Sequence, residues 1–124
     1  MSSNDTLQEM FQQQEQFMKL LQRERSFPDF PVDITSKDGQ RVIKEYSHEC
    51  MHELFEAVHM LRNSKSHRAT DVREIDREKY VEELVDALHY FVEVCILSGI
   101  SADELFNAYI YKGDVNSKRI IGGY

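Results

Sequence analysis

The sequence predicts an all-α protein of four helices arranged as in a four-helix bundle. Apolar residues recur every three or four positions in four separate stretches, which is the spacing of one helix face. No stretch of useful length alternates apolar and polar residues as a half-buried strand does. With 124 residues and 41% apolar content, the chain is long enough to form a core of its own, so we predict a single domain over residues 1–124.

The predicted helices span residues 6–25, 40–62, 71–98 and 102–112. A long N-terminal loop, residues 26–39, separates the first two, because Pro28 and Pro31 remove backbone donors and restrict the residues before them. Ser101 and Glu104 form a capping box at the start of the fourth helix. The residues after that helix are predicted to form an extended basic C-terminal tail.

The expected core follows from the same periodicity. On the second helix it includes Val42, Ile43, Tyr46, Cys50, Leu54, Val58 and Leu61. On the third helix it includes Ile75, Val81, Leu84, Val85, Leu88, Val92, Cys95 and Ile96. Both cysteines of the chain are in these two sets, and we interpret them as small core residues, since no CxxC motif is present.

The charge balance excludes two classes of partner. The net charge is -7 and no basic run is present, so we expect binding neither to nucleic acid nor to an anionic membrane surface. The most apolar run, residues 90–100, contains Glu93 and is far shorter than the ~20 residues of a spanning helix. The N-terminal residues have neither the basic start nor the apolar centre of a signal peptide, and this predicts a cytoplasmic protein.

Two pairs of carboxylates carry the functional prediction. Glu53 and Glu56 share one face of the second helix, and Glu83 and Asp86 share one face of the third. A single pair of this kind is usually a solvated surface, but these two pairs border the apolar stripes, where unpaired charge is costly. If the pairs face each other, a hard divalent cation such as Mg²⁺ relieves their repulsion and leaves positions for water and phosphate. The pattern therefore predicts a metal-dependent phosphate enzyme.

The second helix also contains His48, Glu49 and His52, which spell the HExxH pattern of zinc proteases. Such an enzyme needs a third zinc ligand and apolar residues after the second histidine, where this chain has Glu53. Surface or helix-packing histidines are the simpler interpretation. An HExxH zinc protease and a non-enzymatic helical adaptor remain as alternatives from other functional classes.

The carboxylate motifs resemble those of a known family. ELFE at 53–56 and ELVD at 83–86, separated by 26 residues, are similar to the ExxE and ExxD motif pair of the all-α nucleoside triphosphate pyrophosphatase (MazG-like) superfamily. Residues 83–124 most resemble the dimeric dUTPase and phage dCTPase branch, which has a lysine, an asparagine and an arginine ahead of a terminal GY. The resemblance covers residues 40–124, but the tryptophan-bearing segment of that branch is replaced here by RNSKSHR at 62–68.

The resemblance implies magnesium-dependent hydrolysis of a deoxynucleoside triphosphate to the monophosphate and pyrophosphate. It implies Glu53, Glu56, Glu83 and Asp86 as ligands of two or more Mg²⁺ ions, with Mn²⁺ as a substitute, and Glu49 or Glu53 as the general base. The implied substrate-binding residues are Lys65, Arg68, His89, Lys112, Asn116 and Arg119.

Because the tryptophan is missing, the sequence does not predict which nucleobase the substrate carries. A dUTP- or dCTP-type substrate is the default, and a purine such as dGTP is the alternative. The resemblance further implies a dimer or a dimer of dimers, with a neighbouring chain completing the pocket. A role in phage-type control of nucleotide pools, in the host cytoplasm if the protein is viral, completes the expectation.

Overall fold

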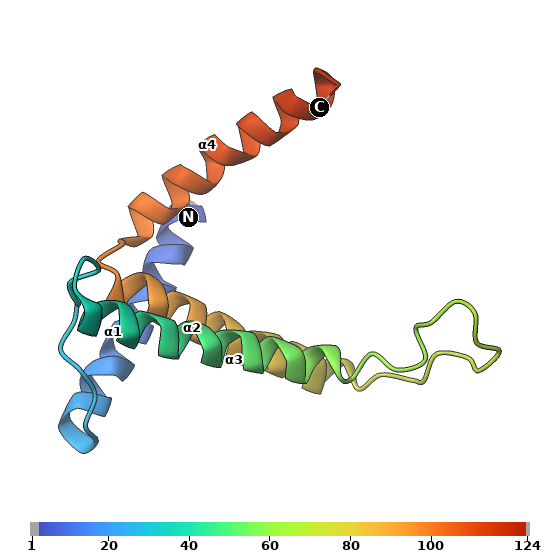
Figure 1. Ribbon diagram of the computed structural model, residues 1–124, viewed down its shortest axis with the longest axis horizontal. Coiled ribbons are helices and arrows are strands. Elements are labelled where there is room, and N and C mark those ends of the chain that lie inside the picture. The colour runs from blue at the N-terminus through green and yellow to red at the C-terminus, as the bar shows by residue number, and fades with distance from the viewer. Residues whose placement is uncertain (1–2, 124) are drawn as a thin grey trace. The chain divides into compact units, whose positions relative to one another are not determined.

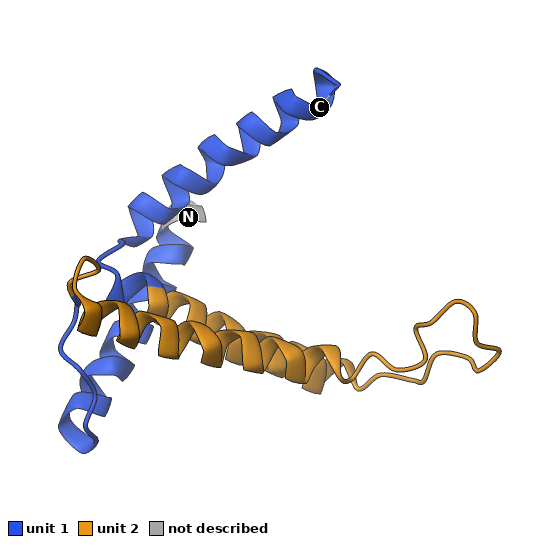
Figure 2. Ribbon diagram, in the orientation of Figure 1, with its two compact units in different colours: residues 1–32, 95–124 blue, residues 33–94 orange. Residues whose placement is uncertain are grey.

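The computed structural model describes residues 3–123 and contains four α-helices, α1 (Ser3–Glu24), α2 (Lys37–Val58), α3 (Arg77–Leu97) and α4 (Ala102–Ile121) (Figure 1). Over this range no strand is formed, so the predicted all-α class and the number of helices are confirmed. The chain divides into two compact units, residues 1–32 with 95–124 (unit 1) and residues 33–94 (unit 2), and the boundary lies inside α3 (Figure 2).

In unit 1, α1 packs against α4. The backbone N–H of Val32 donates to the carbonyl of Leu97 at 2.8 Å, which attaches the residues after α1 to the end of α3. Gly99 ends that helix with a positive φ of 76°, a conformation that side chains disfavour, and lies against Pro31. The buried side chains of this unit are Phe11, Gln14, Met18, Cys95, Leu97 and Ala102.

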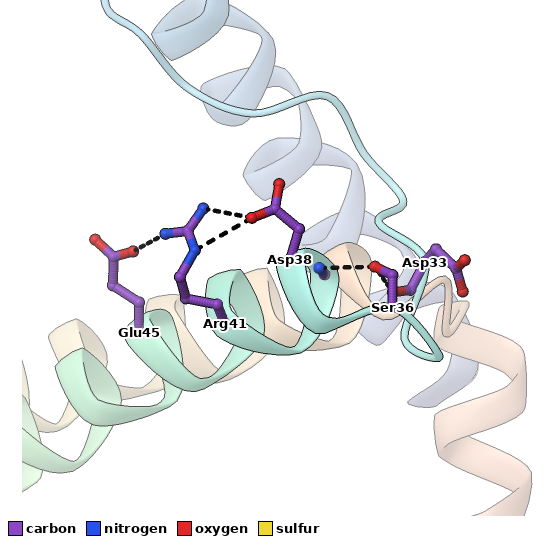
Figure 3. A network of polar contacts seen from close by, with 6 residues as sticks. Asp33, Ser36, Asp38, Arg41 and Glu45 are labelled. Atoms are coloured by element: carbon purple, nitrogen blue, oxygen red, sulfur yellow. Dashed lines mark hydrogen bonds and ion pairs between the residues drawn. The ribbon is translucent and has the colours of Figure 1, made fainter.

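Unit 2 begins with a network of short polar contacts that starts α2 (Figure 3). The Asp33 carboxylate accepts hydrogen bonds from the backbone N–H and the hydroxyl of Thr35, and these bonds lower its pKa. The Ser36 hydroxyl accepts a hydrogen bond from the N–H of Gly39 at 2.9 Å and so caps the helix. Within the first turns of α2, Arg41 pairs with Asp38 and with Glu45.

The body of unit 2 is the antiparallel pair formed by α2 and α3, which run side by side (Figure 1). The Cys50 thiol donates to the carbonyl of Ala87 at 3.2 Å and links the two helices directly. Residues 59–76 form the connection between them and project beyond the helix ends (Figure 1). The buried residues of this unit are Gly39, Val42, Ala57, Ala87, Val92 and Glu93.

Several helix boundaries differ from the predicted ones. Helix α1 begins at Ser3 and not at residue 6, and α2 ends at Val58 and not at residue 62. The connection between α1 and α2 covers residues 25–36, because Ser36 caps α2 and the helix begins at Lys37, three residues before the predicted start. The third helix begins at Arg77 and not at residue 71, with the Asp76 carboxylate accepting from the N–H of Lys79 at 3.2 Å.

The predicted extended tail is mostly helical, since α4 continues to Ile121. Gly113 lies inside this helix, but one glycine costs a helix only about 1 kcal/mol and does not end it. Lys118 and Arg119 lie in the last turn, where positive charge interacts favourably with the helix dipole.

The predicted core of unit 2 is only partly buried. Val42 and Val92 are buried as expected. The exposed members of the predicted core are Leu54, Val58, Leu61, Ile75, Val81, Leu84, Val85 and Leu88, with exposed fractions between 37% and 48%. Periodicity identifies the apolar side of each helix correctly, but two helices facing each other cover only a narrow strip of those sides. An apolar surface of unit 2 therefore stays open, and Phe55, at 61% exposed, belongs to it.

Within residues 3–123, no single helix is long and apolar enough to cross a membrane, and α3 and α4 reach that length and composition only as a bent pair.

Candidate metal centre

Three carboxylates from α2 and α3 converge. Glu53, Glu83 and Asp86 each offer one oxygen, and these oxygens all lie within 4.8 Å of one another. Glu83 and Asp86 are three residues apart, so they share a face of α3, and the antiparallel pairing of the helices brings Glu53 of α2 opposite them. All three side chains are half-buried. The facing carboxylates predicted from the sequence are thus present for three of the four residues.

Repulsion within this group contributes to a raised pKa of Glu53. Burial raises the pKa of the Glu53 carboxyl most, and the neighbouring charge of Asp86 adds to that effect. Glu83 and Glu56 raise this pKa further, whereas His52 lowers it. Like charges held this close favour either a proton or a cation among them. The group is therefore set up to bind positive charge.

The donor atoms suit a hard cation. The group offers carboxylate oxygens alone, without nitrogen or sulfur, which is the ligand set of Mg²⁺, Mn²⁺ or Ca²⁺ rather than of Zn²⁺. Among the described residues it is the one set of three or more potential ligand side chains close enough to hold an ion. The residues present therefore fit the predicted magnesium.

Glu56 does not join the group in the structure. Its carboxylate pairs with the His52 imidazole at 3.4 Å, one helical turn back along α2. The three-residue spacing of Glu53 and Glu56 is the same as that of Glu83 and Asp86, so helical rotation alone does not keep Glu56 out of the group. The box of four carboxylates predicted from the sequence is therefore a group of three here.

The HExxH residues form no metal group within the described part of the chain. His52 is engaged with Glu56, and both His48 and Glu49 are exposed on α2. His48 lines a shallow surface depression together with Lys37, Arg41 and Lys44. These three side chains are positively charged and do not bind zinc. The zinc protease pattern thus lacks a third ligand among residues 3–123.

The remaining predicted site residues lie on other parts of the fold. Lys65 and Arg68 are exposed in the connection 59–76, where the N–H of Arg68 donates to the carbonyl of Lys65. His89 is exposed on α3. The three predicted phosphate ligands, Lys112, Asn116 and Arg119, are exposed on α4 in unit 1, and their spacing of four and three places them on one helix face.

A second polar group, for which the sequence predicted no role, lies further along the same two helices. Glu93 is 3% exposed, and its Oε1 has no hydrogen-bond partner in the part of the chain that the structure describes. Burial raises the pKa of its carboxyl from the ordinary 4.5 to about 7. Burial is also the main cause of the raised pKa values of Tyr46 and Tyr90, and Glu93 contributes to both. The signal in the sequence was an acidic residue inside the most apolar run of the chain.

Protein-family models, characterised proteins and solved structures were compared with the chain, and none matches it. The three carboxylates and the side chains around them are therefore the basis for a functional proposal.

Proposed function

We propose that the protein is a magnesium-dependent deoxynucleoside triphosphate pyrophosphohydrolase, which converts a dNTP and water to the dNMP and pyrophosphate. The observation that carries this proposal is the convergence of Glu53, Glu83 and Asp86 from two helices, half-buried and with oxygen donors alone. The similarity of ELFE and ELVD to the ExxE and ExxD motif pair supports it from the sequence. By default the substrate is of the dUTP or dCTP type.

Glu53, Glu83 and Asp86 would hold the divalent cation, Mg²⁺ or Mn²⁺, with Glu56 as the expected fourth ligand. Such an ion, when bound, neutralises phosphate oxygens and makes a bound water more acidic. Glu49 or Glu53 then takes the proton of the attacking water.

The carboxylates repel the negative charge of the phosphates, so positive side chains are needed to bind the triphosphate. Lys112, Asn116 and Arg119 on α4 would bind the triphosphate, since guanidinium and ammonium groups stabilise the charge that gathers on the departing pyrophosphate. Lys65 and Arg68 of the connection would add to this charge. His89, on the same helix as Asp86, would contact the nucleotide.

We propose that the chain acts as a dimer or a dimer of dimers. The open apolar surface of α2 and α3 supports this, because contiguous exposed apolar residues mark association sites. Both cysteines are free thiols, which supports a reducing, cytoplasmic setting. Control of nucleotide pools is the role we propose, in the host cytoplasm if the protein is viral.

The test is a hydrolysis assay with each common dNTP, with Mg²⁺ and with EDTA, in which dNMP and pyrophosphate are separated by chromatography. Glu53→Gln and Asp86→Asn should each lose at least 100-fold in kcat/KM, while the matched control Glu82→Gln, an exposed carboxylate of α3, should keep full activity.

Three results would count against the proposal. Absence of metal-dependent hydrolysis with every dNTP refutes it outright. Zinc-dependent peptide cleavage that is lost in His48→Ala identifies the protease alternative. A melting temperature that neither metal nor nucleotide changes identifies an adaptor, because a ligand that binds the folded state must stabilise it.

A further inference from the structure

Glu93 combines two properties that rarely occur together. Its side chain is 3% exposed, and its Oε1 is buried without a hydrogen-bond partner. A buried polar atom that lacks a partner costs stability, and native proteins retain few of them. Glu93 does not belong to the group of three carboxylates that would hold the metal. Among the described residues 3–123, Glu93 therefore lacks the partner that its burial calls for.

Glu93 is nevertheless connected to that group by a row of polar side chains. Asp86 and Glu93 are seven residues apart, which places them on the same face of α3, about 10 Å apart along the helix axis. Tyr90 lies between them, and its pKa is raised by burial and by the charges of Glu49, Glu93, Glu53 and Asp86. The row thus leads from the carboxylate group to Glu93 within unit 2.

Burial increases along this row from its exposed end on α2 to Glu93 on α3. Glu49 is exposed, Tyr46 and Tyr90 are half-buried, and Glu93 is buried. Burial raises the pKa of Tyr46, and Glu93 and Tyr90 add to that increase, so Tyr46 of α2 faces these residues of α3. Two aromatic rings that precede a buried hydrogen-bonding group are the usual composition of a site for a planar polar ligand.

We propose that Glu93 is the specificity-determining residue for the nucleobase: its free Oε1 accepts a hydrogen bond from an N–H group on the base edge, and Tyr46 and Tyr90 flank the nucleoside. This assignment rests on the proposed function, because it takes the phosphates to be bound at Glu53, Glu83 and Asp86. A sugar and a base cover the distance from the metal group to Glu93.

The chemistry of Glu93 determines which hydrogen-bonding groups the base must present. Its pKa of about 7 keeps a large fraction of the carboxyl protonated at neutral pH, so that it presents a donor beside an acceptor. Cytosine, uracil and adenine each present a donor beside an acceptor on their pairing edge and match this pattern. Guanine presents its N1–H donor beside the O6 acceptor and beside the N2 amino donor, so it matches both the protonated and the ionised carboxyl. The carboxyl of Glu93 therefore requires an N–H group on the pairing edge of the base and does not exclude dGTP.

The experiment compares Glu93→Met and Glu93→Gln with wild type and with the control Glu82→Gln. Steady-state kinetics are measured with dCTP, dUTP, dATP and dGTP, and inhibition by inorganic tripolyphosphate reports the phosphate site alone. In Glu93→Met we expect KM for the preferred dNTP to rise at least 10-fold, since a buried hydrogen bond to the base is lost. Glu93→Gln, which still offers a donor beside an acceptor, should keep the preference, and tripolyphosphate should inhibit all variants equally.

The outcomes separate the two proposals. If wild type hydrolyses a dNTP but Glu93→Met keeps its KM for all four substrates, or loses tripolyphosphate inhibition to the same extent as dNTP binding, Glu93 does not read the base. If wild type hydrolyses no dNTP, the proposed function fails first and the assignment fails with it. Replacing an unpartnered buried carboxyl with an apolar side chain removes its desolvation cost, so Glu93→Met should fold at least as stably as wild type. Glu93→Gln serves as a second variant for the same comparison.

Discussion

Asp86→Asn should be more stable than wild type when no metal is present. When metal is bound, the variant should be less stable than wild type. The Asp86 carboxylate lies within 4.8 Å of those of Glu53 and Glu83. Two like charges at 4 Å repel by about 1 kcal/mol in water and about 4 kcal/mol at an effective dielectric constant of 20. These side chains are half-buried and partly screened, so we take about 1 kcal/mol for each of the two pairs that Asp86 forms.

Asparagine keeps the shape of the side chain and removes this repulsion, so that Asp86→Asn should gain about 1–2 kcal/mol when no metal is bound. For a domain of this size that gain corresponds to a rise of roughly 4–8 °C in melting temperature. Wild type should gain about 2.7 kcal/mol from a cation supplied at 100 times its Kd. The variant should gain far less, because it has lost one of three charged ligands.

The measurement is a thermal melt of both proteins at one concentration and low ionic strength, first in EDTA and then over a series of MgCl₂ concentrations. We expect the two melting temperatures to change order as Mg²⁺ is added. Glu82→Gln, which removes an exposed charge of the same helix outside the group, should follow wild type in both conditions. Destabilisation of Asp86→Asn already in EDTA, or equal gains from Mg²⁺ in both proteins, would falsify the interpretation of these carboxylates as a repulsive cation site.

Three further predictions concern stability and thiol chemistry. Gly39→Ala should destabilise the protein by about 2 kcal/mol in urea unfolding, because a Cβ there would overlap the Asp33 carbonyl; an unchanged midpoint would contradict it. Since Glu93 has a pKa raised to about 7, the folded state binds more protons than the unfolded state between pH 4.5 and 7, so stability should fall across this range by about 2 kcal/mol after discounting for solvent screening. Urea unfolding of Glu93→Gln should lack that slope. Burial raises the pKa of the Cys95 thiol to about 11 and that of the Cys50 thiol as well, so both should react slowly with a disulfide reagent at pH 7 and rapidly in urea; fast labelling of the native protein would refute this.

The sequence predicted the helices well because their signals are local. Apolar periodicity and the capping hydroxyl of Ser101 act within a few residues, and the structure has a helix at each predicted place. Boundaries that depend on less regular chemistry were missed. The start of α2 depends on contacts among Asp33, Thr35 and Ser36, and the continuation of α4 depends on a glycine that the helix tolerates.

The sequence predicted that carboxylates from two helices would meet, but not which of the four would do so. Spacing alone places Glu53 and Glu56 on one face of α2. Whether both reach the same point depends on competing partners, and His52 supplies such a partner for Glu56. Glu93 was missed for a different reason: its burial and its unpartnered oxygen are tertiary properties, which the sequence indicates only by an acid inside an apolar run.

Self-association and cation binding should be linked, because the same two helices carry both surfaces. Leu54 follows Glu53 directly, and Leu84 and Val85 lie between Glu83 and Asp86, all three with exposed fractions of 37% to 48%. A second copy that covered these apolar side chains would also withdraw water from the carboxylates between them, and desolvation strengthens the repulsion of like charges. A bound cation removes that penalty, so Mg²⁺ should favour the oligomer and the oligomer should favour Mg²⁺ by the same factor. Sedimentation velocity in EDTA and in MgCl₂ measures this linkage, and an association constant that is equal in both would show that the two surfaces act independently.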